Sequence, residues 1–365
     1  MVVSKEKVLQ ALSKVIDPDF KKDLVSLGMI KDVAVTGNKI SFTVELTTPA
    51  CPLKEMIRKD CEQTILEELG DGYEVDINMS SNVTTIREQA TTLPNVKNII
   101  AVASGKGGVG KSTITANLAT ALARSGAKVG LIDADIFGPS MPTMFNCEHE
   151  QPTVIEKNGK NMIVPIEQYG VKILSIGFLS PADNAIVWRG PMASSALKQF
   201  ITDADWGELD YLLIDLPPGT SDIHLTLVQT VPVTGAVLVT TPQKVALADA
   251  IKGLQMFRQP QINVPILGIV ENMAYFTPAE LPENKYYIFG REGGKRLAEK
   301  YEIPLLGQIP LVQSIRESSD EGHPAVMEDN ITGNAFRILA EELARQIAIR
   351  NATMDRTKIV EIKTM

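Results

Sequence analysis

Short apolar runs that alternate with helical segments constrain the fold of this chain more than any other feature. From residue 98 onward the runs read NIIAVAS, KVGLIDAD, KILSIGF, YLLIDLP, GAVLVTTP, PILGIVENM and PLLGQIP. Strands that are apolar on both faces and separated by helices indicate a parallel sheet covered on both sides. Right-handed crossovers then predict an α/β fold, a doubly wound and mostly parallel sheet, over residues 96–350 with a last helix at about 333–349. A hairpin signal at Asn158-Gly159 interrupts the series.

Residues 1–80 follow a different pattern, which predicts a small α+β domain. Apolar side chains recur at helical spacing over residues 5–16 and again from the end of TTPACP to about Leu69. Residues 29–46 read as a hairpin that turns at TGNK, and GYEVDINMS reads as a third strand. The polar residues 81–95 are expected to form a linker or, alternatively, an ordered arm packed on either domain, and residues 351–365 a C-terminal tail.

Composition narrows the class of partner. The net charge of −8 and the pI of about 5.2 argue against a surface for nucleic acid. No apolar run reaches the roughly 18 residues of a membrane span, and the tail lacks a basic amphipathic helix. The first residues, MVVSKEKVLQ, lack the apolar core of a secretory signal. We therefore expect a cytoplasmic protein with neither nucleic acid nor membrane as partner.

The stretch SGKGGVGKST, residues 104–113, matches the phosphate-binding pattern G-x-x-x-x-G-K-[ST] from Gly105 to Ser112. An apolar run precedes it and a helical segment follows, which is the context that this motif requires. Its glycines would let backbone N–H groups approach phosphate oxygens, Lys111 would reach the β- and γ-phosphates, and Ser112 would bind Mg²⁺. The predicted nucleotide-binding residues of the loop are Gly105, Lys106, Gly107, Gly108, Val109, Gly110, Lys111, Ser112 and Thr113.

Two aspartate motifs complete the predicted site. LLIDLPPG ends an apolar strand at Asp215, the expected position for the acid that holds Mg²⁺ together with Ser112, and Gly219 could offer its N–H to the γ-phosphate. LIDADIFGPS ends another strand at Asp133 and Asp135, either of which could orient the attacking water or contact Mg²⁺. We assign the water to Asp135, whose alternative role is to cap a turn or helix.

A second lysine, Lys106, follows the first glycine of the loop. Because Lys111 already serves the loop in cis, Lys106 is free to reach a nucleotide in a facing subunit, like an arginine finger supplied in trans. The alternative is a solvated loop lysine. KGGVGKS resembles the deviant Walker ATPases, the class of MinD, ParA and the nitrogenase iron protein. The resemblance implies that Lys106, Lys111 and Asp135 are the catalytic residues of a nucleotide-sandwich homodimer.

The chain resembles one branch of that class, the Mrp/ApbC iron–sulfur cluster carriers, through GKGGVGKST, DADIFGPSMP, WRGPM, DLPPGTSD and ENMAYF. The N-terminal stretches VIDPDF, DLVSLGMI and LTTPACP resemble a small domain of iron–sulfur maturation factors. The resemblance implies a slow, dimer-dependent ATPase that assembles or transfers clusters to apoproteins and meets assembly proteins. It also implies ATP as the nucleotide, with Asn272 beside the adenine and the residues after Pro310 near the base.

One departure from that family concerns its C-P-x-C pair after ENM. Thr277 and Glu280 stand where the two cysteines would be, and neither is a suitable ligand for iron–sulfur chemistry. The remaining candidate is Cys51 in TTPACPLKEM, where Pro52 would open a helix whose N-terminus stabilises the thiolate. We expect Asp17, Asp19 and Asp23 near it; the alternative is a half-buried structural cysteine.

The other cysteines and the histidines offer no second site. Cys61 is expected in the core of a helix and Cys147 has no assigned role, since three cysteines without a C-x-x-C form no disulfide framework. The three histidines are too far apart for metal-ligand spacing. Two other functions remain open: a cluster-free ATPase scaffold or regulator of the same pathway, and a MinD/ParA-like positioning switch.

Overall fold

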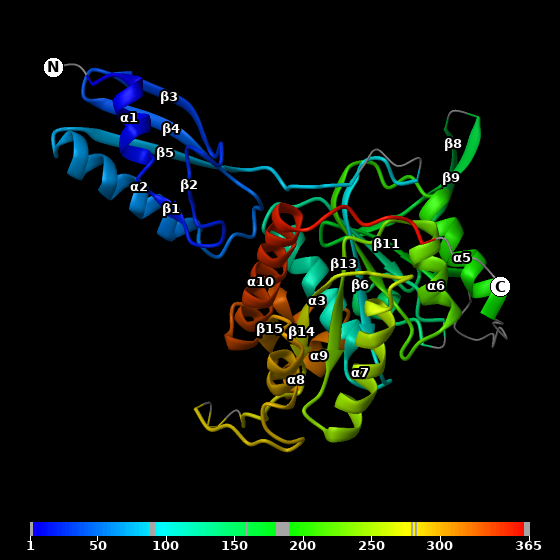
Figure 1. Cartoon of the computed structure of the whole chain (residues 1–365). Helices are drawn as coiled ribbons and strands as arrows, with labels where there is room; N and C mark the ends of the chain where they lie inside the picture. Colours follow the sequence, from blue (N-terminus) through cyan, green and yellow to red (C-terminus); the bar gives the residue numbers. More distant parts are fainter. Residues whose placement is uncertain are drawn as a thin grey trace.

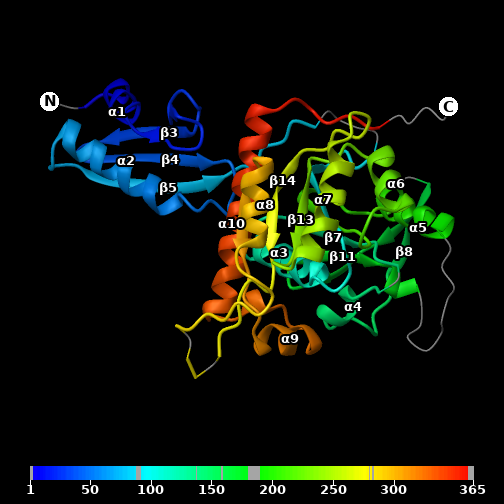
Figure 2. The ribbon, with the colours of Figure 1, turned by 60° about the horizontal axis from the view of Figure 1, so that its bottom comes forward.

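The computed structural model describes residues 3–87, 92–136, 138–157, 159–179, 190–278, 280–281 and 283–360. Parts of the predicted linker, of the tail, of DADIFGPSMP and of WRGPM, and Asn158 of the hairpin, lie outside the described residues. Figure 1 shows a small blue unit, formed by the start of the chain, beside a larger body, and helix α10 (Ile331–Thr353) stands between them. Figure 2 shows the same arrangement from another side.

The larger body is built on an eight-stranded sheet of order β10-β11-β7-β12-β6-β13-β14-β15. Only β10 pairs antiparallel, with β11, so the predicted doubly wound, mostly parallel sheet is confirmed. From β6 the chain first builds one half of the sheet and then the other, so the end of β6 lies at the switch point where α/β sheets bind ligands. The strands are β6 (Val96–Ser104), β7 (Val129–Asp133), β10 (Ile166–Gln168), β11 (Val171–Ser175), β12 (Leu209–Asp215), β13 (Gly235–Thr240), β14 (Ile266–Glu271) and β15 (Leu305–Gln308).

Helices cover both faces of this sheet, and their apolar residues form two separate buried clusters. One cluster includes residues of α3 and α10, the other residues of α5, α6, α7 and α8. Gly126, at φ +103°, ends α3 as predicted, whereas α10 is longer at both ends than the predicted 333–349. The helices are α3 (Lys111–Arg124), α4 (Met141–Met144), α5 (Gly190–Thr202), α6 (Asp222–Thr230), α7 (Lys244–Arg258), α8 (Gly293–Tyr301), α9 (Gln313–Asp320) and α10, with 3-10 turns at Ile176–Leu179 and Ala325–Met327.

The N-terminal unit is a three-stranded sheet of order β3-β4-β5 with two helices. Ile57, Cys61 and Ile65 lie one helical turn apart on α2 and face its core. One predicted boundary is wrong: the first helix ends at Leu12 rather than residue 16, because Ile16 pairs with Asp23 instead. Helix α2 starts after TTPACP and ends at Leu69, as predicted. The elements of this unit are α1 (Lys5–Leu12), β1 (Ile16–Asp17), β2 (Lys22–Asp23), β3 (Ile30–Thr36), β4 (Lys39–Leu46), α2 (Lys54–Leu69) and β5 (Glu74–Ser81). In the larger body, β8 (Thr153–Lys157) and β9 (Lys160–Val164) pair antiparallel and form the predicted hairpin.

The described part of the predicted linker is an ordered arm. Val83 is buried in the larger body, and the Thr85 hydroxyl donates to the carbonyl of Lys97 on β6 at 2.6 Å. The tail also packs on this body, where the N–H of Val360 donates to the Val228 carbonyl at 2.9 Å. No helix among the described residues is both long and apolar enough to cross a membrane.

Candidate nucleotide site and N-terminal cysteine

The phosphate loop lies between the end of β6 at Ser104 and the start of α3 at Lys111, at the switch point of the sheet. Gly108 and Gly110 both have φ +78°, which glycine adopts without strain. Gly105 is needed for a different reason, since a Cβ there would stand 2.1 Å from the backbone carbonyl carbon of Asp249 on α7. The first backbone N–H groups of α3 therefore open into a loop shaped for an anion.

Lys111, Ser112 and Asp215 form the centre of the site. The Lys111 Nζ lies 2.7 Å from Asp215 Oδ2, and the Ser112 hydroxyl donates to the same oxygen at 2.6 Å. Burial by itself lowers the pKa of Lys111, but the nearby carboxylates of Asp215 and Asp135 outweigh it, so the net pKa is raised and the ammonium stays charged. A buried cation, a hydroxyl and a carboxylate thus converge where the sequence predicts the phosphate and Mg²⁺ groups.

The two aspartates at the end of β7, Asp133 within the strand and Asp135 after it, have separate positions. Asp135 faces the loop, with its Oδ2 3.4 Å from the Lys111 Nζ. Asp133 is fully buried, and its Oδ2 accepts bonds from the Ser175 hydroxyl and from the backbone N–H groups of Ser140 and Met141 at 2.8 to 3.2 Å. Burial, then the charge of Asp215, raises the pKa of Asp133 to about 7. Asp135 thus faces the loop, whereas the hydrogen bonds of Asp133 hold the segment that follows β7.

Three other predicted residues lie around the loop. The Asn272 side chain is buried and donates to the Val109 carbonyl at 2.9 Å, so it braces the loop from the end of β14. The N–H of Gly219 donates to the Ser104 carbonyl at 2.8 Å, which places the segment after β12 against the start of the loop. Lys106 is exposed, and its ammonium forms no salt bridge with another described residue.

Sequence reasoning missed two residues that hold the acids in place. The hydroxyl of Thr115, one turn after Lys111 on α3, donates to Asp215 Oδ1 at 2.7 Å. Ser175 ends β11 beside Asp133, its register partner on β7. Helical spacing from Lys111 was the available signal for Thr115, and the shared edge of parallel strands was the signal for Ser175.

Cys51 lies in the segment between β4 and α2 and is half-buried. The predicted helix N-terminus is wrong there, because Leu53 is the N-cap of α2 and Cys51 precedes it. Burial, with only a backbone hydrogen bond near Leu53 opposing it, raises the pKa of the Cys51 thiol, and the charges of Asp17, Asp19 and Glu341 raise it further. Asp17 and Asp19 therefore lie near the thiol as predicted, and the expectation for Asp23 stays a prediction. The thiol is held protonated, the reverse of the predicted thiolate.

The other candidate ligands do not gather into a metal site. Thr277 is half-buried and Glu280 exposed, while Cys61 and Cys147 are buried and burial raises the pKa of each thiol to about 12. Within the described ranges, no group of three or more His, Cys, Asp or Glu side chains is placed to hold a metal ion. A single chain therefore offers no complete ligand set in this part of the structure.

Comparison with known proteins identifies the family. Residues 95–347 match the ParA family of NUBPL iron-transfer P-loop NTPases, and residues 5–77 match the iron–sulfur cluster assembly protein family. The chain belongs to the iron–sulfur cluster carrier family of P-loop NTPases. The iron–sulfur cluster carrier protein of Synechocystis is 45% identical over 95% of this chain and 99% of its own length, and that of Deinococcus radiodurans is 48% identical over 94% and 96%. Both halves of the predicted resemblance are thus confirmed.

A solved structure supports the fold of the larger body. The nucleotide-binding protein of Archaeoglobus fulgidus, solved in complex with ADP, is 40% identical and has a TM-score of 0.57. The similarity covers 65% of this chain and 90% of that one. As a P-loop NTPase of this family, the chain is an ATPase.

Proposed function

We propose that this chain binds and hydrolyses ATP, and that the ATPase cycle drives the assembly or transfer of iron–sulfur clusters to apoproteins. The observation that carries the proposal is the convergence of Lys111 and Ser112, at the N-terminus of α3, with Asp215 at the end of β12. The chain's membership of the iron–sulfur cluster carrier family supports the cluster as the group that is transferred. Hydrolysis is slow and serves to switch the conformation of a homodimer.

The residues present fit a magnesium–nucleotide complex. Mg²⁺ prefers hard oxygen ligands, and the Ser112 hydroxyl and Asp215 Oδ2 lie 2.6 Å apart at one point of the site. When bound there, Mg²⁺ neutralises charge on the β- and γ-phosphates. Lys111 turns from Asp215 to the phosphates, the N–H groups from Gly105 to Thr113 line them, and Asp135 orients the attacking water. Asn272 lies beside the adenine, where it also fixes the Val109 carbonyl.

Lys106 acts across the dimer in this proposal, and its exposure at the loop supports that role. Lys106→Ala should retain ATP binding but lose hydrolysis that depends on protein concentration. Lys111→Ala should lose both, because the site loses its in-cis cation. An equal mixture of the two variants forms one composite site with both native lysines, so phosphate release should recover. Normal hydrolysis by Lys106→Ala alone would show that the lysine has no role in trans.

The cluster is cargo, and Cys51 is the proposed thiol ligand. A dimer supplies two Cys51 thiolates, and exchangeable thiols complete the iron shell, so binding is labile and limited to one cluster per dimer. Anaerobic reconstitution followed by iron and sulfide counts should show this cluster in the wild type and in Cys147→Ala, but not in Cys51→Ala. Absence of iron and sulfide in the wild type would reject the carrier role. Thr277 and Glu280, in place of the usual cysteines, would then favour a cluster-free scaffold or regulator with the same ATPase.

The proposed partners follow from this cycle: a second copy of the chain, and apoprotein clients or assembly proteins. The acidic pI supports a protein without a nucleic-acid partner. The cytoplasmic location remains a prediction.

A further inference from the structure

The segment Thr48–Cys51 of the N-terminal unit is anchored in the core of the larger body. The Tyr211 hydroxyl on β12 donates to the Thr48 Oγ1 at 3.0 Å, and both residues are almost fully buried, at 1% and 2% exposed. Ala50, two residues on, is part of the buried cluster that includes α3 and α10. Thr48 and Ala50 thus anchor this segment to the larger body, and Cys51 follows them directly. The exposure of the Cys51 thiol therefore depends on whether these two contacts are kept.

Two elements connect this anchor to the nucleotide site. On β12, Tyr211 precedes Asp215 by four residues, about 13 Å along a strand. Helix α3 starts at Lys111 and is about 21 Å long, and its last turn lines a cavity of about 490 Å³ together with Ala50 and Glu341. The same two elements thus carry the phosphate-site groups at one end and contact the cysteine segment at the other.

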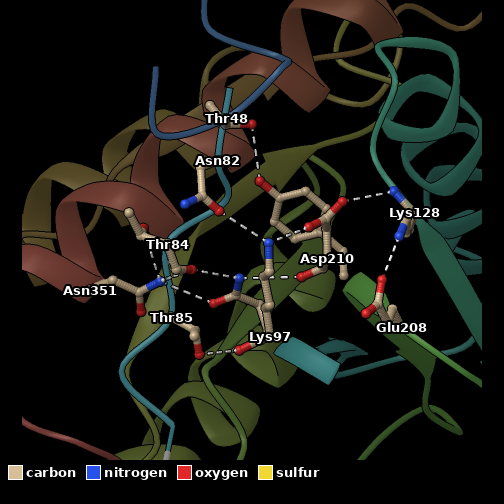
Figure 3. Close-up of polar contacts among 11 residues, drawn as sticks. Thr48, Asn82, Thr84, Thr85, Lys97, Lys128, Glu208, Asp210 and Asn351 are labelled. Atoms are coloured by element: carbon tan, nitrogen blue, oxygen red, sulfur yellow. Dashed lines mark hydrogen bonds and ion pairs between the residues drawn. The ribbon is translucent and has the colours of Figure 1, made fainter. Parts of the chain in front are cut away.

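A polar network at the amino end of the sheet joins the linking arm to the larger body (Figure 3). The Asn98 side chain on β6 donates to the Thr84 carbonyl of the linking arm at 3.0 Å, and Asn351 of α10 donates to the same carbonyl at 2.9 Å. Arg345, also on α10, forms a salt bridge with Asp19 of the N-terminal unit, with its Nε 2.8 Å from Oδ1. β6 is the strand that leads into the phosphate loop, so every one of these anchors lies on an element of the nucleotide site or on α10, which packs against α3.

We propose that docking of the N-terminal unit is coupled to the nucleotide site, so that binding of magnesium–ATP loosens the Thr48–Cys51 segment and exposes the Cys51 thiol. In this proposal, nucleotide binding separates the Lys111 ammonium from the Asp215 carboxylate. The change occurs at the start of α3 and at the end of β12, which are the ends of these elements that lie away from the anchor. Stiff packed elements with two arrangements carry such coupling. The coupling rests on the nucleotide binding of the proposed function, which calorimetry with the ATP analogue tests by itself, and the use of this thiol for cargo rests on the carrier role.

Thiol modification of cluster-free protein tests the coupling. Cys61 and Cys147 are 0% and 1% exposed, so the fast-reacting thiol of the folded chain is Cys51, and Cys51→Ala provides the blank. With an aromatic disulfide reagent, we expect the fast rate to rise at least about fivefold on addition of Mg²⁺ and a non-hydrolysable ATP analogue, the lower end of typical coupling between sites.

Two variants weaken the anchor without touching the phosphate site. Tyr211→Phe removes only the hydroxyl, and Arg345→Gln removes the salt bridge with Asp19; Arg58→Gln, which loses an exposed ion pair on α2, is the matched control. In the first two, the thiol should react fast with or without nucleotide. Because coupling is reciprocal, they should also bind the ATP analogue more tightly than the wild type, an effect that mere local damage would not produce.

Arg58→Gln should behave as the wild type in both assays. A wild-type thiol rate that nucleotide leaves unchanged or lowers overturns the proposal, as does unaltered nucleotide affinity in both anchor variants. Iron and sulfide uptake, measured separately, tests the cargo role, so failure of one proposal can be told from failure of the other.

Discussion

Substituting Gly105 by alanine tests why the phosphate loop needs a glycine at its start. A Cβ on Gly105 would lie 2.1 Å from the Asp249 carbonyl carbon and 2.4 Å from the Ala250 nitrogen, both in the backbone of α7. Gly107, in the same loop, is the matched control, since its Cβ would meet only Pro218 at an ordinary 3.8 Å. Neither glycine has a positive φ, so the difference lies in packing and not in backbone conformation.

The expected cost of Gly105→Ala follows from this overlap. Helix backbone cannot move aside like the end of a flexible side chain, so the loop or α7 must shift by more than 1 Å, at roughly 3 kcal/mol or more for overpacking. For a body of this size, that energy corresponds to a melting temperature lower by about 6–12 °C. Gly107→Ala should change the melting temperature little, because alanine lowers the conformational entropy of the unfolded chain and this stabilisation offsets small strains in the folded state.

Thermal unfolding of nucleotide-free protein is the decisive assay, because it distinguishes two reasons for a glycine at this position. One is packing against α7, and the other is close approach to a bound phosphate. If glycine were needed only for phosphate contact, the two variants would melt alike and differ only in nucleotide affinity. Equal melting temperatures would therefore refute the reasoning. We also expect ADP to bind to Gly105→Ala at least tenfold more weakly, measured by calorimetry, if the loop rather than α7 takes up the shift.

Two further predictions concern buried polar groups. Thr115→Val should weaken magnesium–ATP binding about 10- to 100-fold in calorimetry, because a hydrogen bond to a charged group contributes roughly 1.5–3 kcal/mol, and Thr115→Ser should restore it. Burial lowers the pKa of His224 from 6.5 to about 4, so between those pH values the unfolded chain binds the extra proton. Folding stability should then fall by up to about 3 kcal/mol as pH drops from 6.5 to 4, and His224→Gln should flatten this slope in denaturant titrations; an unchanged slope would contradict it.

The fold was predictable because its signal is local. Each strand of the parallel sheet is a continuous apolar run, and the phosphate motif fixes which strand lies at the switch point. The boundaries failed where tertiary contacts decide them. Ile16 has the apolar character that continues the first helix, yet it leaves that helix to pair with Asp23. Helix α10 runs past its predicted end because Asn351 and Arg350 find partners in the linking arm and the tail.

The site was predictable only for the residues that belong to a local sequence motif. Lys111, Ser112 and Asp215 converge as expected because a loop and two strand ends meet at one edge. The sequence pattern allows either Asp133, the last residue of β7, or Asp135 to contact the water, and we assign the water to Asp135. Their environments differ through Ser140 and Met141, which follow Asp133 by seven and eight residues, and through Ser175, which is distant from it in sequence.

Cys51 shows how an environment can reverse a motif-based expectation and still suit the same role. The proline after it suggested a helix N-terminus and a stabilised thiolate, but α2 begins later, and burial with the charges of Asp17, Asp19 and Glu341 raises the pKa of the thiol. A protonated thiol is a poor nucleophile, so Cys51 is protected from oxidation while no metal is near. Iron must displace that proton to bind, and the acidic neighbours that raise the pKa also attract the incoming cation. If Cys51 holds a cluster as proposed, its retention should therefore weaken as pH falls, and a proton and a competing thiolate should suffice for release.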